Sequence, residues 1–160
     1  MSLSDLYAER SYCREQIGYW QNSADIYQSR MDQNIADIKH LEEQLRIANN
    51  ALTKCQALTS MDFELTGDLM KVGNSIDSAL DVSVGTLVQT INTDNADHIG
   101  SSINNCNTLI EELQAKLDQA RADLEYNTEG RDYSNGRVSH YEDRLSAVQS
   151  AIDNWDDDDD

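Results

Sequence analysis

The chain of 160 residues contains no proline and only one phenylalanine. Without proline, every residue can donate a backbone hydrogen bond, so helices of roughly 50 residues can run without interruption. Charged residues make up 26% of the chain and its mean hydropathy is -0.66, which leaves too little apolar material for a thick globular core. These absences favour a thin, elongated, all-α architecture.

Positive charge is also scarce, because 12 basic residues face 30 acidic ones and the net charge is -18. Such a charge repels phosphate backbones and anionic membranes, so nucleic-acid binding is not expected. No stretch approaches the length of a membrane span, and the first twenty residues lack the basic start and apolar run of a signal peptide. We therefore expect a cytoplasmic protein with no membrane insertion.

What the chain does contain is two long heptad repeats, written abcdefg with apolar residues at a and d. The first runs from Leu3 to Cys55 and the second from Ile99 to Trp155. Repeats of this length are typical of coiled-coil seams. They predict a helix over 3–55 and a helix over 96–155, paired as a long antiparallel hairpin.

Residues 56–98 lose the heptad but keep shorter stretches of helical spacing. We expect two short helices there, at about 65–80 and 83–92, at the distal end of the hairpin. Thr59 is placed to cap one of them. Residues 1–155 then form a single elongated helical domain, and the acidic run at 156–160 is expected to be a disordered tail.

Exposed charges distinguish two possible registers of the hairpin that differ by one heptad. One places Glu9 beside Arg144 and yields further opposite-charge pairs at g positions, whereas the other yields none. Because flanking charges help to select register, we expect the first. It separates Cys55 from Cys106 by about 15 Å along the helices, so these thiols should stay reduced.

No pattern in the chain points to catalysis, to a cofactor or to a metal. The histidines His40, His98 and His140 are spread along c positions, and there is no HExxH motif, no glycine-rich phosphate loop and no nucleophile elbow. The three cysteines all occupy d positions, where a thiol acts as a small apolar residue. We expect a protein that is not an enzyme.

A second stripe lies on c positions beside the seam and is aromatic and apolar. It consists of Tyr12, Tyr19 and Ile26 in the first helix and Tyr126 and Tyr133 in the last. In the expected register the small residues Ser23 and Gly130 face each other between these walls. The arrangement predicts a groove for a partner helix, since tyrosine is enriched at interfaces; five scattered surface residues are the alternative.

The same register leaves Ile152 and Trp155 beyond the start of the first helix. Nothing else in the chain would cover them there. Because exposed apolar ends beside charge often mark contact sites, we expect both residues to dock on a partner or on a second copy of the chain.

The hairpin pattern, the opening Met1-Ser-Leu-Ser-Asp-Leu-Tyr-Ala8 and the segment Phe63-Glu-Leu-Thr-Gly67 resemble the YwqH-like small helical proteins. That family is related to the WxG-type substrates of type VII secretion and is found beside LXG toxins. The resemblance implies a turn at Phe63 and Gly67, although a Trp-x-Gly turn would have different spacing. No Tyr-x-x-x-Asp/Glu export motif occurs in the chain.

The resemblance implies a non-enzymatic partner or targeting protein that binds the helical domain of an LXG toxin, or a second small helical protein, for type VII secretion. Such a protein could leave the cell without a cleavable signal peptide. The alternative is a coiled-coil scaffold or spacer in another assembly, either a self-associating homodimer or a phage structural protein.

Overall fold

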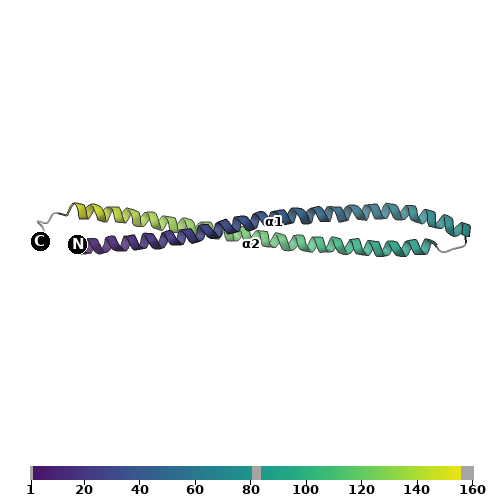
Figure 1. Cartoon of the computed structure of the whole chain (residues 1–160), viewed down its shortest axis with the longest axis horizontal. Helices are drawn as coiled ribbons and strands as arrows, with labels where there is room; N and C mark the ends of the chain where they lie inside the picture. Colours follow the sequence, from purple (N-terminus) through teal and green to yellow (C-terminus); the bar gives the residue numbers. More distant parts are fainter. Residues whose placement is uncertain (1, 81–83, 156–160) are drawn as a thin grey trace. The chain divides into compact units, whose positions relative to one another are not determined.

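The computed structural model describes residues 2–80 and 84–155, with the side chains of residues 2–61 and 93–155. Two helices account for nearly all of this range: α1, Leu3–Leu80, and α2, Val84–Asp153. They pack against each other in opposite directions, and the described ranges contain no strand (Figure 1). The predicted all-α helical hairpin is confirmed.

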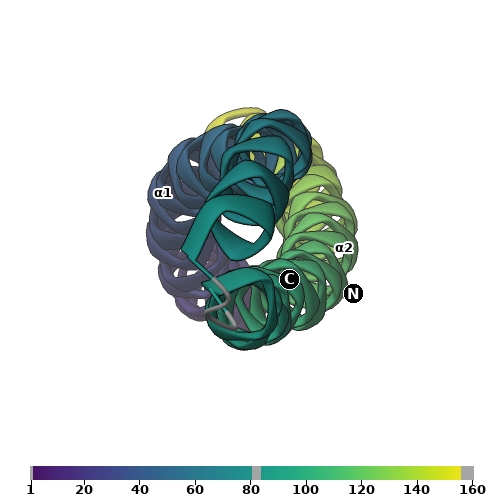
Figure 2. The ribbon, with the colours of Figure 1, turned by 90° about the vertical axis from the view of Figure 1, so that its right-hand side faces the viewer.

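The chain divides into two compact units, where the sequence predicted one domain. The first unit comprises Met1–Ile38 and Gln119–Asp160, and the second comprises Lys39–Asp118. In each unit a segment of α1 lies beside a segment of α2, as the side and end views both show (Figures 1 and 2).

The start of α1 is held by a capping box. The Ser2 hydroxyl accepts a hydrogen bond from the backbone N–H of Asp5 at 3.2 Å, and the Asp5 carboxylate accepts one from the backbone N–H of Ser2 at 2.8 Å. This reciprocal pair satisfies donors that a helix start leaves unpaired. The backbone hydrogen bond from Ser2 lowers the pKa of the Asp5 carboxyl.

The heptads correctly identify the face on which each helix is buried. Every a and d position in both predicted seams is buried or half-buried. The buried side chains of the first unit are Leu6, Cys13, Ala24, Met31, Ala120, Asn127, Ser134 and Tyr141, and those of the second are Ala48, Leu113 and Leu117. Each unit thus has a narrow core of one seam.

The expected short helices are not separate elements, because α1 continues without interruption to Leu80. The Thr59 hydroxyl, expected to cap a new helix, instead donates to the backbone carbonyl of Cys55 at 3.2 Å within α1. Phe63 and Gly67 also lie inside α1, so the turn implied by the family resemblance is wrong. Loss of the heptad changes what a helix packs against, but in a chain without proline it does not end the helix.

The boundary expected between the two short helices, after residue 80 and before residue 83, falls where α1 ends at Leu80 and α2 begins at Val84. Residues 81–83 themselves lie outside the described part of the chain, as does the acidic tail at 156–160.

The predicted register is wrong, although its Glu9–Arg144 ion pair is present. Short side chains report register most directly, because they cannot reach far along a helix. Ser23, expected opposite Gly130, instead makes a 3.1 Å hydrogen bond with Ser134, one turn further along α2. In the second unit, Cys55 and Cys106 interact with each other, although about ten residues of offset were expected between them. These contacts fit the alternative register, one heptad away.

Buried polar groups explain this outcome. The amide of Asn127, which is 7% exposed, donates a 2.9 Å hydrogen bond to the side-chain oxygen of Asn34. A buried polar group left without a partner costs about 1–3 kcal/mol, whereas an exposed ion pair contributes about 0.2–1 kcal/mol. The longer arginine side chain still reaches Glu9 after the shift, so the charge pair does not distinguish the two registers.

The same shift removes the expected overhang at the end of α2. The observed register places Ile152 opposite Leu6 and Trp155 opposite Leu3, and both Ile152 and Trp155 are half-buried. The prediction that nothing in the chain covers these two residues is therefore wrong. They do not form an exposed docking site.

Candidate functional site

The two units differ sharply in aromatic content. All seven tyrosines and both tryptophans of the chain belong to the first unit. The basic residues divide as well, since every lysine lies in the second unit and every basic residue of the first unit is an arginine. The first unit therefore concentrates Tyr, Trp and Arg, the residue types that dominate binding hot spots.

Three pairs of rings join α1 to α2 in this unit. The pairs, with the distances between ring centroids, are Tyr12–Tyr141 at 6.0 Å, Trp20–Tyr133 at 5.6 Å and Tyr27–Tyr126 at 6.5 Å. All three have the edge-to-face geometry that aromatic quadrupoles favour. We call these six residues, together with Tyr19, the aromatic ladder.

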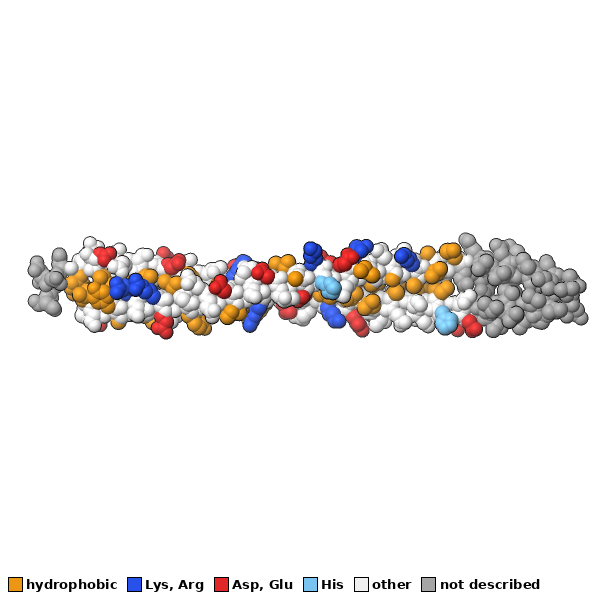
Figure 3. All heavy atoms as spheres, in the orientation of Figure 1, with side chains coloured by type: hydrophobic (Ala, Val, Ile, Leu, Met, Phe, Trp, Pro, Cys, Tyr) orange, Lys and Arg blue, Asp and Glu red, His pale blue; other side chains and the backbone are white. Residues whose placement is uncertain are grey.

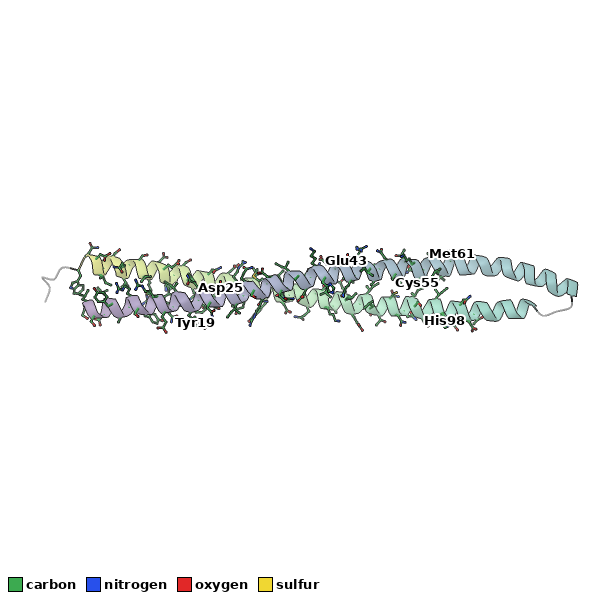
Figure 4. The ribbon with its side chains drawn as sticks, in the orientation of Figure 1. Tyr19, Asp25, Glu43, Cys55, Met61 and His98 are labelled. Carbon is green, nitrogen blue, oxygen red and sulfur yellow. The ribbon has the colours of Figure 1, made fainter. Side chains whose placement is uncertain are left out.

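The outer rings of the ladder are solvent-exposed but held in place. Tyr19, Tyr126 and Tyr133 are 62%, 65% and 62% exposed. Tyr19 packs edgewise on Trp20 with 5.0 Å between ring centroids, and Trp20 also carries Tyr133 on α2. Tyr19 points away from the partner helix in Figure 4. The half-buried rings thus orient the exposed ones.

All five residues of the predicted stripe are exposed, since Tyr12 and Ile26 are 43% and 45% exposed. Tyr19 and Tyr133 both pack on Trp20. Sequence reasoning missed the inner rings Trp20, Tyr27 and Tyr141, because at d positions they were taken for ordinary core residues.

The predicted groove is not open at its floor. A Cβ atom added to Gly130 would lie 2.5 Å from the ring of Tyr27, so the glycine gives space to that ring and not to a partner. Ser23 is similarly occupied by its hydrogen bond with Ser134, whose hydroxyl also donates to the Gly130 carbonyl at 2.9 Å. The surface is therefore a ridge of rings rather than a groove.

Arginines stack on the ladder. The Arg137 guanidinium lies 5.7 Å from the Trp20 ring centre and 5.1 Å from that of Tyr141, and it donates a 3.0 Å hydrogen bond to the Tyr141 hydroxyl. Arg144 also lies over Tyr141, at 5.9 Å, and pairs with Glu9. Such cation–π contacts fix flexible cations at defined positions beside the exposed rings.

Two buried donors in this cluster have no acceptor among the described residues. They are the indole N–H of Trp20 and the Nε–H of Arg137. A buried donor without a partner costs free energy. Local conflicts of this kind are typical of functional surfaces rather than of packing selected for stability alone.

The pKa values of two groups in the first unit are raised, which favours their neutral forms. A hydrogen bond with Tyr141 raises the pKa of the Tyr12 phenol, and charge on Tyr141 adds to this effect. Burial, followed by the Glu9 carboxylate, raises the pKa of the Cys13 thiol. The cations beside the ladder are the guanidinium groups of Arg137 and Arg144.

In residues 2–61 and 93–155, no three His, Cys, Asp or Glu side chains are grouped so that they could hold a metal ion. His40 bonds to Gln44 at 2.9 Å, and His140 packs against Tyr141. Over the part of the chain that the structure describes, neither helix has an apolar stretch long enough to cross a membrane.

Apolar side chains also reach the surface elsewhere, in patches separated by charged and polar residues (Figure 3). Ile47, Leu58 and Met61 of the second unit are 54%, 51% and 65% exposed. These side chains have no rings, so the ring–ring packing that orients the outer tyrosines is not open to them. The ladder is thus the better-organised of the exposed apolar surfaces.

Comparison with known proteins finds no family model, no curated protein and no solved structure that matches this chain.

Proposed function

We propose that this chain is a non-enzymatic helical protein that binds a helical segment of another protein through the aromatic ladder. The observation that carries the proposal is the set of three outer tyrosines, each more than three-fifths exposed and each held edgewise by another ring. A surface that orients its aromatic side chains in advance loses little conformational entropy when it binds.

The dimensions of the ladder suit a helical partner. Tyr12 and Tyr27 are fifteen residues apart on α1, which corresponds to about 22 Å at about 1.5 Å per residue. A partner helix of about four turns spans that length and can present apolar anchors at every third or fourth position. The net charge of -18 favours a partner whose surface is basic around those anchors.

The family resemblance adds the identity of the expected partner, which is the helical domain of an LXG toxin destined for type VII secretion. In this proposal the chain binds the toxin domain in the cytoplasm and assists its delivery to the secretion machinery. It contributes a binding surface rather than chemistry, and it requires no cofactor.

A self-associating scaffold is the second candidate. It is favoured by the exposed apolar residues of the second unit, Ile47, Leu58 and Met61, which a second copy could cover. The two candidates differ in the surface that they bury and in the oligomeric state of the isolated protein.

Co-expression with the helical N-terminal domain of an LXG toxin encoded beside this chain tests the proposal. Size-exclusion chromatography with light scattering should show a hetero-complex that survives dilution to about 1 μM, as expected for a specific interface. An unrelated helical hairpin of similar charge serves as the control partner. Failure to bind the toxin domain, together with a stable homodimer, would instead support the scaffold.

A further inference from the structure

Two cysteines meet across the helices of the second unit. Cys55 of α1 and Cys106 of α2 both occupy d positions of their seams and both are half-buried. Cys55 lies between the two helices in Figure 4, and it lies near enough to Cys106 to raise the pKa of that thiol. Both thiols are free in the structure.

The register supports this pairing independently. Within the second unit, Cys55 lies 25 residues before the end of α1 at Leu80, and Cys106 lies 22 residues after the start of α2 at Val84. Because the two helices are antiparallel and follow each other along the chain, these similar counts place the two thiols at nearly the same level.

We propose that Cys55 and Cys106 are an oxidation site at which an intramolecular disulfide joins α1 to α2. A peroxide is sufficient as the oxidant. One thiolate attacks a peroxide oxygen, the O–O bond breaks, and the departing oxygen takes a proton to leave as water and give a sulfenic acid. The second thiolate attacks that sulfur, the S–O bond breaks, and hydroxide leaves as a second water. Two thiols and one hydrogen peroxide thus become one disulfide and two waters.

The bond would join the two helices of the second unit beside its seam. Among the described side chains of that unit, Ala48, Leu113 and Leu117 are buried. A crosslink between residues 55 and 106 closes a loop of about 50 residues, which restricts the unfolded chain. We expect the melting temperature to rise by about 10 °C on oxidation. In a reducing cytoplasm both thiols remain free.

The environment of the thiols sets the pH dependence of the reaction. Burial raises the pKa of the Cys106 thiol, as does the neighbouring Cys55 thiol. Because the thiolate is the attacking species, crosslinking should be more than about tenfold faster at pH 9 than at pH 7. Cys13 is fully buried beside Glu9 and provides an internal control.

Treatment of the full chain with dilute hydrogen peroxide, followed by non-reducing peptide mapping, tests the proposal. Trypsin cuts after Lys54, Lys71 and Lys116, so the two cysteines fall on separate peptides, 55–71 and 72–116. The expected product is these two peptides joined by a disulfide in a protein that remains monomeric. Cys13→Ala should crosslink normally, whereas Cys55→Ala and Cys106→Ala should not crosslink and should not show the rise in melting temperature.

Three outcomes would overturn the proposal. They are free thiols at both positions after treatment, sulfinic acid without a disulfide, and disulfides formed only between separate chains. Since the wild-type chain itself is the substrate, none of these results depends on the folding of a variant.

Discussion

Replacing Gly130 with alanine should destabilise the protein, although alanine is the better helix former by about 1 kcal/mol. The added Cβ would lie 2.5 Å from ring carbons of Tyr27, which is closer than real contacts allow. Forcing atoms into a packed site typically costs about 1–3 kcal/mol. We expect a net loss of up to about 2 kcal/mol in the free energy of unfolding, measured by urea denaturation, and a larger loss for Gly130→Leu.

Gly18 and Gly136 provide matched controls in the same unit. A Cβ at either position meets nothing within 4 Å, so Gly18→Ala and Gly136→Ala should each stabilise the protein by about 0.5–1 kcal/mol. If Gly130→Ala were as stabilising as Gly136→Ala, the ring of Tyr27 could not lie against Gly130. The space beside Gly130 would then be open, as the predicted groove requires.

The double variant Tyr19→Ala/Tyr133→Ala should weaken binding of the helical partner by at least about 100-fold. Aromatic anchors at the centre of an interface commonly contribute about 2 kcal/mol or more each. Both side chains are 62% exposed, so the melting temperature of the free protein should change little. Isothermal titration calorimetry against the toxin domain measures the loss.

Tyr7 offers a control on the same unit, because it is also an exposed tyrosine but stacks with Arg10 outside the ladder. Tyr7→Ala should bind normally. Phenylalanine at positions 19 and 133 should recover most of the affinity if ring packing dominates. Equal binding by the double alanine variant and the wild type would remove the ladder from the interface.

The buried face of each helix could be predicted from sequence because it depends only on spacing. The apolar residues of a heptad repeat lie on one face of the helix, and that face packs against the neighbouring helix. The a and d positions of the two seams, Leu3 to Cys55 and Ile99 to Trp155, are accordingly buried or half-buried. The extent of α1 was underestimated for a related reason. The heptad repeat shows where a helix packs against another helix. Whether the helix continues depends instead on the absence of helix-breaking residues such as proline.

Register could not be derived from the charges, because opposite charges at the surface form pairs in more than one register. The Glu9–Arg144 pair is present even though the register that predicted it is wrong. The informative signal was the small and polar residues within the seam, such as Asn34 and Asn127.

The exposed tyrosines of the candidate site could also be predicted, since c positions face solvent in either register. Their organisation could not, because Trp20 holds both Tyr19 and Tyr133 only through specific ring orientations. The proximity of Cys55 to Cys106 was not predicted, because the expected register separated these two residues along the helices. The contacts between the two helices thus could be identified only from the structure, whereas the buried and exposed faces of each helix could be predicted from the sequence.

Hydroxyl-radical footprinting of the free chain, and of the chain mixed with the proposed partner, a helical toxin domain, tests the central claim most directly. Tyrosine and methionine side chains both react with the radical, so one experiment reports on both units. Binding through the ladder predicts protection of Tyr19, Tyr126 and Tyr133, with unchanged oxidation of Met61 in the second unit. Protection of Met61 with undiminished oxidation of the three tyrosines would contradict the proposed binding surface.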